Sequence, residues 1–361
     1  MSVDEPVLGI DGLRVHFQDK DRGIRNAFAE PDTVRAVDGV SVDIMEDEVL
    51  VIVGESGCGK STLGRAAIGI ERPTEGSVKY RGQDIWDAKE MRGDVRVPYS
   101  EIRRSLQHIH QDPGSSLNPN RTIKSTLLEP LKNTRPGMSN EQRVERILTL
   151  LDYVGMSPPE DYIGRYPHQL SGGEQQRVAL IRVFLMNPDL ILADEAVSAL
   201  DVSLRIDIMD LMLELQEMYG TSFIYISHNL SNARYLAGRS GGRIAIMYLG
   251  EIVEMGTPEE IIHDPQHPYT KAIRWAAPDI NPHEGSDFED LPVRSIDIPD
   301  PVNPPNGCRF HTRCPEAREI CSEEHPELRE ADGESGQHVA CYRAFEEHPY
   351  WESRSIVPDD R

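Results

Sequence analysis

The sequence is poor in lysine and in positive charge overall. It has 7 lysines and 31 arginines against 61 aspartates and glutamates, and the formal net charge of its 361 residues is −23. A surface this acidic repels polyanions, so the composition argues against binding to nucleic acid or to an anionic membrane. It suits a cytoplasm of high salt concentration, in which counterions screen the self-repulsion. An ordinary acidic protein is the alternative interpretation.

Long apolar runs are also absent. No uninterrupted stretch approaches the ~20 apolar residues that a membrane-spanning helix needs. The first residues, Met1-Ser2-Val3-Asp4-Glu5, lack the basic and apolar parts of a signal peptide. We therefore expect a soluble, intracellular chain, whose length suggests two or so domains at ~150 residues each.

Cysteine is scarce and unevenly placed. Cys58 stands alone, and the remaining four cysteines are grouped near the C-terminus: Cys308, Cys314, Cys321 and Cys341. In a reducing compartment such a group indicates a metal or cluster site rather than disulfides. The spacings between these cysteines differ from the C-x2-4-C pairs of common zinc sites. Zinc nevertheless remains a candidate for the bound metal. His311 and His338 are further candidates for a mixed site, with surface positions as the alternative.

Hydrophobic patterns predict an α/β fold with a parallel sheet. Apolar and polar residues alternate over Val7–Phe17 and Val34–Ile44, as in half-buried strands, and the charged segment between them is expected to connect a hairpin. Later segments alternate between strand and helix patterns, which is typical of a parallel sheet. These segments are a strand at Val49–Val53, helices at Ser61–Ile70 and Met138–Leu151, a strand at Leu190–Ala193, a helix at Val202–Tyr219, a strand at Ser222–Ile226 and a closing hairpin at Ile244–Val253.

A phosphate-binding loop follows the first of the apolar strands. The residues Gly54-Glu55-Ser56-Gly57-Cys58-Gly59-Lys60-Ser61, followed by Thr62, fit the pattern G-x-x-x-x-G-K-[ST] between a strand and a helix. Glycines allow backbone N–H groups to converge on phosphate oxygens, and the helix N-terminus favours anions. Lys60 is expected to reach the outer phosphates, and Ser61 to bind Mg²⁺.

Further polar groups follow the later strands. Asp194 and Glu195 come directly after Leu190–Ala193, and His228 follows Ser222–Ile226. Since ligands of open α/β sheets bind at the carboxyl ends of the strands, these groups are expected near the phosphate loop. Asp194 suits a role in holding Mg²⁺, and Glu195 is free to activate the attacking water. His228 is a candidate for sensing the γ-phosphate, although a histidine after a strand is more often a capping or packing residue.

The sequence Leu170-Ser171-Gly172-Gly173-Glu174-Gln175-Gln176-Arg177 resembles the signature motif of ABC-type ATPases. The other family motifs follow in order: Gln111 as the Q-loop, Ser198-Ala199-Leu200-Asp201 as the D-loop and His228 as the switch histidine. The resemblance extends from Val7 to Cys341. It implies that Ser171, Gly172 and Gly173 bind the nucleotide held by an opposing subunit, and that Gln111 contributes to the Mg²⁺ site and to catalysis.

The resemblance narrows to the oligopeptide/dipeptide importer branch of this family. The segments that carry it are Gln111–Pro119, Asp194–Val202, Tyr248–Gly250 and Gln266–Thr270. The Gln-Gln-Arg ending of the signature motif favours the F-type ATPase subunit of this branch over its D-type partner. Three positions depart from the family pattern, namely Glu174 for glutamine, Ala196 for proline and Asn229 for aspartate, and none of them removes a catalytic group.

The resemblance implies an ABC ATPase fold with a P-loop parallel-sheet core, an N-terminal antiparallel β subdomain and an inserted helical subdomain. The expected domains are a nucleotide-binding domain at 1–276 with its helical subdomain at about 112–170, a linker at 277–305, a Cys-rich extension at 306–345 and a tail at 346–361. It also implies an adenine-stacking aromatic before the phosphate loop, with Phe17 as the candidate and Phe28 as the alternative. Packing in the core is the simpler role of either ring.

The segment Gly307–Pro315 resembles the C-terminal extension of oligopeptide-importer ATPases, which in some members holds a [4Fe–4S] cluster. Four thiolates, one followed by Pro315, suit such a cluster. Zinc and free thiols are the alternatives. A bound group would staple a segment that has little apolar content of its own.

The family supplies the remaining expectations. Two ATP molecules are sandwiched between two such subunits, and the partners are a second ATPase subunit of the D-type, two transmembrane permease subunits and an extracellular solute-binding protein, at the cytoplasmic face of the membrane. A homodimer is the alternative assembly. The cargo is an oligopeptide or dipeptide, with nickel chelates and sugars as alternatives. A soluble ABC ATPase without a transport role is the rival function.

Overall fold

The computed structural model describes residues 5–18, 33–110, 117–198, 200–277, 292–331 and 336–357. The chain forms two compact units. Unit 1 comprises Met1–Leu8, Asp43–Glu48 and Lys79–Ile226, and unit 2 comprises Gly9–Val42, Val49–Val78 and Ser227–Arg361. Within the described ranges, no helix combines the length and the apolar character that crossing a membrane requires.

Unit 1 contains three neighbouring parallel strands, β6 (Leu106–Ile109), β7 (Leu190–Asp194) and β8 (Ser222–Ser227). The first four residues of the central strand β7 are fully buried, as expected where a parallel sheet is covered on both faces. Helix α9 (Val202–Tyr219) connects β7 to β8 and has the bounds that the sequence predicts. The strand–helix–strand expectation is confirmed here.

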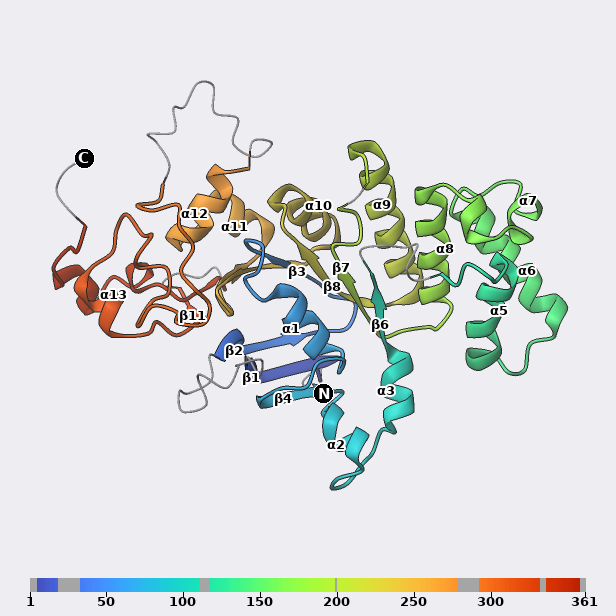
Figure 1. The fold of residues 1–361 in the computed structure, drawn as a ribbon, viewed down its shortest axis with the longest axis horizontal. Coiled ribbons are helices and arrows are strands. Elements are labelled where there is room, and N and C mark those ends of the chain that lie inside the picture. Colours follow the sequence, from blue (N-terminus) through green and yellow to red (C-terminus); the bar gives the residue numbers. More distant parts are fainter. Residues whose placement is uncertain are drawn as a thin grey trace, which may run out of the picture. The chain divides into compact units, whose positions relative to one another are not determined.

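The helical part of unit 1 consists of α5 (Ile123–Thr134), α6 (Asn140–Tyr153), α7 (Glu160–Ile163) and α8 (Gly172–Phe184), which contact one another (Figure 1). Helix α6 begins after Ser139, whose hydroxyl accepts a hydrogen bond from the Gln142 N–H, while the Gln142 side chain accepts one from the Ser139 N–H. This capping box fixes the start of the helix at Asn140, two residues after the predicted Met138. The smaller elements of unit 1 are β5 (Gln83–Asp84), α2 (Ile85–Glu90), α3 (Tyr99–Ser105) and η2 (Pro167–Gln169).

Unit 2 contains a sheet in which β3 (Val49–Val53) runs parallel to β9 (Arg243–Tyr248), and β10 (Glu251–Gly256) returns antiparallel to β9. The expected closing hairpin is therefore present. Two short strands extend it: β12 (His338–Val339) pairs with β10, and β11 (Arg329–Glu330) pairs with β12. Helix α10 (Leu230–Ser240) packs on β3 and β9.

The N-terminal strands of unit 2 form a second sheet, in which β2 (Thr33–Ile44), β1 (Leu8–Gln18) and β4 (Glu75–Tyr80) are neighbours in that order. Both long strands were predicted from their alternation of apolar and polar residues. The alternation places Leu8, Ile10, Leu13 and Val15 of β1 in the core. Of the expected connection between these strands, residues 19–32 lie outside the described part of the chain.

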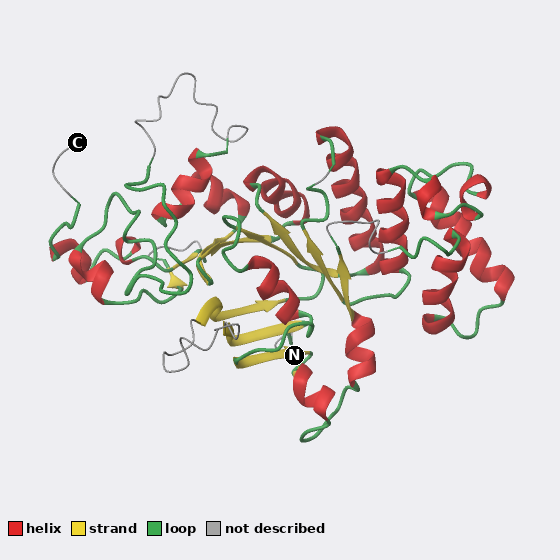
Figure 2. Ribbon diagram, viewed as in Figure 1, coloured by secondary structure: helices red, strands yellow, loops and turns green. Residues whose placement is uncertain are grey.

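The C-terminal part of unit 2 is mostly loop (Figure 2). It contains the helices α11 (Pro258–His263), α12 (Pro268–Trp275) and α13 (Glu319–Glu323), together with the short 3-10 helices η4 (Tyr342–Ala344) and η5 (Pro349–Glu352). Residues 292–305 of the expected linker contain no helix or strand, but Arg294 donates hydrogen bonds to the carbonyls of His311, Thr312 and Ile356. A small core of Ala331, Val339 and Phe345 supports this region.

Candidate nucleotide-binding site

The phosphate loop lies between the fully buried strand β3 and helix α1 (Lys60–Ala67), as predicted. At Gly59 the backbone has φ = 109°, and a Cβ there would lie 1.9 Å from the Ala36 carbonyl oxygen, so the chain can turn into α1 only with glycine. Lys60 is 5% exposed, and its Nζ donates to the carbonyls of Gly54 at 2.8 Å and Glu55 at 2.9 Å. The lysine thus lies along the loop, and Ser61 and Thr62 follow it in the first turn of α1.

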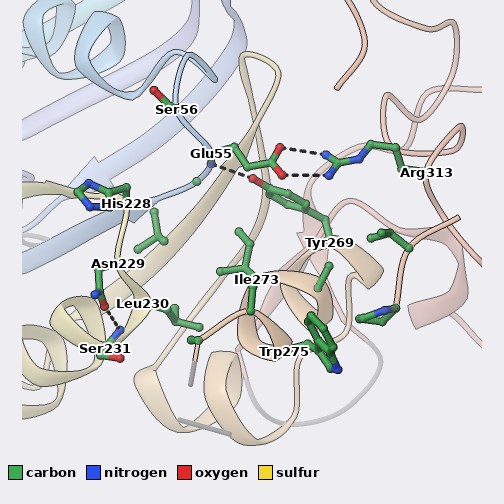
Figure 3. Close-up of a pocket in the computed structure, with 17 residues that line it drawn as sticks. Glu55, Ser56, His228, Asn229, Leu230, Ser231, Tyr269, Ile273, Trp275 and Arg313 are labelled. Atoms are coloured by element: carbon green, nitrogen blue, oxygen red, sulfur yellow. Dashed lines mark hydrogen bonds and ion pairs between the residues drawn. The ribbon is translucent and has the colours of Figure 1, made fainter. Parts of the chain in front are cut away.

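The loop is also held by residues from the C-terminal region. The Glu55 N–H donates to the Tyr269 hydroxyl at 3.0 Å (Figure 3). The Glu55 carboxylate accepts hydrogen bonds from both terminal nitrogens of Arg313, at 2.9 and 3.0 Å (Figure 3). Although burial lowers the pKa of Arg313, its hydrogen bonds with Glu55 and Tyr248 raise it above the ordinary value. The contacts of Glu55 with Tyr269 and Arg313 were not predicted, although Tyr269 and Arg313 both lie in segments that carry the family resemblance.

A cavity of about 570 Å³ opens beside the loop (Figure 3). Its polar lining includes Glu55, Ser56, His228 and Arg313, and its apolar lining comes largely from α10 and α12, including Leu230, Ile273 and Trp275. His228 directly follows β8, as predicted, and its side chain is exposed. Asn229 accepts hydrogen bonds from the N–H groups of Ser231 and Asn232 and caps α10, a role that asparagine fills as well as aspartate does.

In unit 1, Asp194 ends strand β7 and Glu195 begins the next turn. Glu195 has φ = 49°, an uncommon conformation for a residue with a side chain. Its N–H donates to the Ile226 carbonyl at 3.1 Å, and its own carbonyl accepts from the Ser198 N–H at 3.0 Å. Strained backbone of this kind is concentrated at functional sites, because the surrounding contacts must hold it in place.

The signature motif forms the N-terminus of helix α8. Ser171 is the cap: its hydroxyl accepts from the Glu174 N–H, and the Glu174 carboxylate accepts from both the N–H and the hydroxyl of Ser171, at 2.7 and 2.8 Å. Partial burial raises the pKa of Glu174, but the hydrogen bonds from Ser171 outweigh it and hold this pKa below its ordinary value. Ser171 and Gly172 are exposed, so the helix N-terminus is open to an anion.

The remaining predicted site residues lie at several places. Asp201 is exposed at the start of α9, and Phe17 on β1 is 42% exposed, so its ring is available for stacking rather than buried in the core. Gln111, Ala199 and the alternative aromatic Phe28 lie outside the described residues. The phosphate loop and His228 belong to unit 2, whereas Asp194, Glu195, Ser171, Gly172, Gly173 and Asp201 belong to unit 1.

The four C-terminal cysteines line one small cavity, together with His311, Phe310 and Tyr342. The Cys308 N–H donates to the Cys321 carbonyl at 2.8 Å. Burial, and then the charges of the other three thiolates, raise the pKa of Cys308 well above its ordinary value, and burial raises that of Cys314 and of Cys341 to about 12. Across the described ranges, no three His, Cys, Asp or Glu side chains are placed closely enough to hold a metal ion. His338 is not among the residues that line this cavity.

Comparison with known families agrees with these motifs. Residues 37–198 match the ABC transporter family, and residues 253–321 match the C-terminal region of oligopeptide/dipeptide transporters.

Similar proteins extend over most of the chain. It is 43% identical to the oligopeptide transport ATP-binding protein AppF of Bacillus subtilis, over 86% of this chain and 89% of that protein. It is 40% identical to the dipeptide transport ATP-binding protein DppF of Haemophilus influenzae and to the oligopeptide transport ATP-binding protein OppF of Escherichia coli, in each case over 93% of this chain and 96% of the relative.

Among solved structures, a dimeric bacterial ABC transporter cassette matches with a TM-score of 0.56 and 28% identity, over 70% of this chain and 98% of that one. A second, CbiO1 from Clostridium perfringens, matches in fold with a TM-score of 0.57 and 22% identity, over 75% of this chain and 96% of that one. The expected ABC ATPase fold is thus confirmed, and the chain belongs to the ATP-binding proteins of the oligopeptide/dipeptide branch of ABC transporters.

Proposed function

We propose that this protein hydrolyses ATP to drive the uptake of oligopeptides or dipeptides through separate permease subunits. The observation that carries the proposal is the phosphate loop Gly54–Ser61, set between β3 and α1 in a chain that is 40–43% identical to oligopeptide and dipeptide transport ATP-binding proteins. The strained turn at Glu195 and the open N-terminus of α8 support the same function.

In the proposed reaction, Lys60 moves from the loop carbonyls to the outer phosphates of ATP, where its charge stabilises the transferring phosphoryl group. Ser61, Gln111 and Asp194 are the residues that would hold Mg²⁺, and the bound ion would neutralise charge on the phosphates. Glu195 accepts a proton from the attacking water, and His228 senses the γ-phosphate. The exposed cap Ser171, with Gly172 and Gly173, binds the γ-phosphate of the nucleotide held by the opposing subunit.

The proposed assembly is a pair of ATPase subunits on the cytoplasmic face of a permease. The second ATPase subunit is proposed to be of the D-type, as the F-type resemblance of the signature motif implies, with a homodimer as the alternative. Two permease subunits and an extracellular solute-binding protein complete the importer. Residues in about 112–170, which contain helices α5 to α7, are proposed to transmit ATP-driven closure to the permease.

The four cysteines are proposed to hold a [4Fe–4S] cluster, with zinc as the alternative ligand. The support is that all four cysteines line one small cavity and that four thiolates suit such a cluster. The group would connect distant parts of a region that has few helices and strands. Iron, sulfide and zinc analysis of anaerobically purified protein, with its visible absorbance, decides among cluster, zinc and free thiols.

The net charge of −23 supports a further proposal, that the host maintains a salty cytoplasm. Screening of the self-repulsion then raises stability as salt increases. Thermal unfolding in increasing potassium chloride tests this, because an ordinary acidic protein has a much flatter salt dependence.

The ATPase role is tested with Glu195→Gln, which keeps the shape of the side chain and removes its base. The expected result is retained ATP binding with a loss of kcat of about 100-fold or more. Glu217→Gln, on the exposed face of α9, is the matched control and should hydrolyse ATP like the wild type. Equal turnover in the Glu195→Gln and Glu217→Gln variants would remove Glu195 from its assigned role.

A further inference from the structure

The carboxylate of Glu55 stands within the phosphate loop itself. Its side chain is 30% exposed, and Glu55 lines the same cavity as Ser56 and His228 (Figure 3). A carboxylate at this position carries a negative charge next to the place where a triphosphate binds. Two negative charges at short range repel each other strongly in a partly buried site. This charge therefore works against ATP binding unless another group neutralises it.

Arg313 is that group. Its two terminal nitrogens bond to the two Glu55 carboxylate oxygens at 2.9 and 3.0 Å, which is the bidentate arrangement that gives the strongest ion pairs. Arg313 is 6% exposed, and its guanidinium lies 5.5 Å from the Phe310 ring centre and 5.7 Å from that of Tyr248. Its Nε also donates to the Ser295 carbonyl at 3.2 Å. The arginine is thus fixed in place before any nucleotide binds.

The main chain of Glu55 is held from the same side. Its N–H donates to the Tyr269 hydroxyl, and the Tyr269 ring packs against the rings of Tyr248 and Phe310, at centroid distances of 4.5 and 5.4 Å. Burial raises the pKa of Tyr269 well above its ordinary value, so this hydroxyl stays neutral. Both the backbone and the side chain of Glu55 are therefore fixed by residues that lie more than two hundred positions later in the chain.

We propose that Arg313 is a positioning residue of the ATP site, which neutralises Glu55 and holds its carboxylate away from the bound phosphates. The inference rests on the proposed ATPase function and makes the C-terminal region part of the nucleotide site. Arg313 directly precedes Cys314, so the polypeptide that lines the four-cysteine cavity continues without interruption to the phosphate loop.

The test is a double-mutant cycle with Arg313→Gln, Glu55→Gln and the double variant. Calorimetric titration of the purified full-length chain with ATP and Mg²⁺ gives the affinity, and kinetics of the assembled complex separate KM from kcat. Arg313→Gln should weaken ATP binding about tenfold, mainly in KM, because Glu55 is left uncompensated. Glu55→Gln should tighten binding about two- to fivefold, because the positive charge remains. The double variant should regain at least half of the affinity that Arg313→Gln loses.

Arg318→Gln is the matched control. Arg318 belongs to the same C-terminal region and donates to the carbonyls of Tyr350, Trp351 and Ser353, with no contact to the phosphate loop among its described hydrogen bonds. The proposal is overturned if Arg318→Gln weakens ATP binding as much as Arg313→Gln, or if the double variant binds no better than Arg313→Gln.

Glu55→Gln keeps the test decisive if Arg313→Gln fails to fold, because weaker ATP binding in that single variant also overturns the proposal. A wild-type chain that binds no ATP would refute the proposed function itself, which is a different outcome.

Discussion

The side-chain amide of Gln176 donates a hydrogen bond to the main-chain carbonyl of Ala196. Both residues are 2% exposed. Gln176 lies in the second turn of helix α8, whose first turn carries the signature motif, and Ala196 directly follows Glu195. The signature helix thus helps to hold the strained turn that presents the proposed catalytic carboxylate.

Loss of this contact should affect both stability and turnover. Gln176→Met keeps the length of the side chain but leaves the buried Ala196 carbonyl without this donor, so the free energy of unfolding should fall by about 1–3 kcal/mol. The ATPase kcat should fall as well, because the Glu195 turn loses a support. Chemical denaturation and steady-state kinetics measure the two effects.

Gln107→Met is the control for this prediction. Gln107 donates to the carbonyls of Arg103 and Arg104 at an exposed helix end, where water can replace it. If this variant loses as much stability and activity as Gln176→Met, the buried contact has no special role.

Glu174, which replaces the more common glutamine of the family signature, should weaken nucleotide binding. Its carboxylate accepts from the Ser171 hydroxyl, and its lowered pKa keeps it ionised where the phosphate is expected. Glu174→Gln preserves the capping box and removes the charge. The KM for ATP of the assembled complex should therefore fall about two- to tenfold. An unchanged or higher KM would contradict this explanation.

A buried histidine should make stability depend on pH. Burial, followed by the charges of Lys271 and Arg343, lowers the pKa of His267 to about 3, while its Nδ1 accepts from the Tyr269 N–H at 3.0 Å. The unfolded chain takes up this proton near pH 6.5 and the folded chain near 3. The folded state therefore binds fewer protons in this window, and the free energy of unfolding falls as the pH falls, by at most about 1.4 kcal/mol per unit from this group.

His267→Asn tests this dependence because asparagine can cap α12 without titrating. The slope of unfolding free energy between pH 6.5 and 4.5, measured by urea denaturation, should be smaller in this variant than in the wild type. His263→Asn, at an exposed position on α11, is the control and should keep the wild-type slope. Equal slopes in His267→Asn and the wild type would assign the pH dependence to other groups.

The thermal stability of the four-cysteine region should depend on each of its thiols. Cys314→Ser should lower the unfolding temperature of the C-terminal region while ATP binding remains measurable, because a bound group would be lost from a region with a small core. Differential scanning calorimetry, with metal analysis of the same sample, measures this effect. An unchanged unfolding temperature would argue against a structural staple.

The elements around the site could be predicted where a local pattern marks them. Apolar runs that end in a glycine-rich loop or an acidic pair identify β3 and β7, and α9 has its predicted bounds. Helix α1 ends at Ala67, three residues before the predicted Ile70, because Gly69 has positive φ and ends the helical pattern. Boundaries are the least certain part of such predictions, because helix ends are set by individual caps.

Contacts between distant segments could not be predicted in this way. Arg313 and Glu55 are 258 positions apart, and an ion pair at that separation leaves no periodic signal in the sequence. The cysteines next to Arg313 indicate metal binding, and nothing in their spacing indicates an ion pair with the phosphate loop. Strands β11 and β12 have two residues each, which is too short for an alternation to be recognised.

The most direct test of the proposed transport function is ATP-driven peptide uptake by the importer purified from host membranes with this chain tagged. The complex is reconstituted into vesicles with its solute-binding protein outside, ATP inside and a labelled oligopeptide as the probe. Permease subunits should copurify with the chain, and uptake should require ATP and be abolished by Glu195→Gln. Recovery of the chain without permease subunits, or uptake that is equal in the Glu195→Gln variant, would contradict the proposed function.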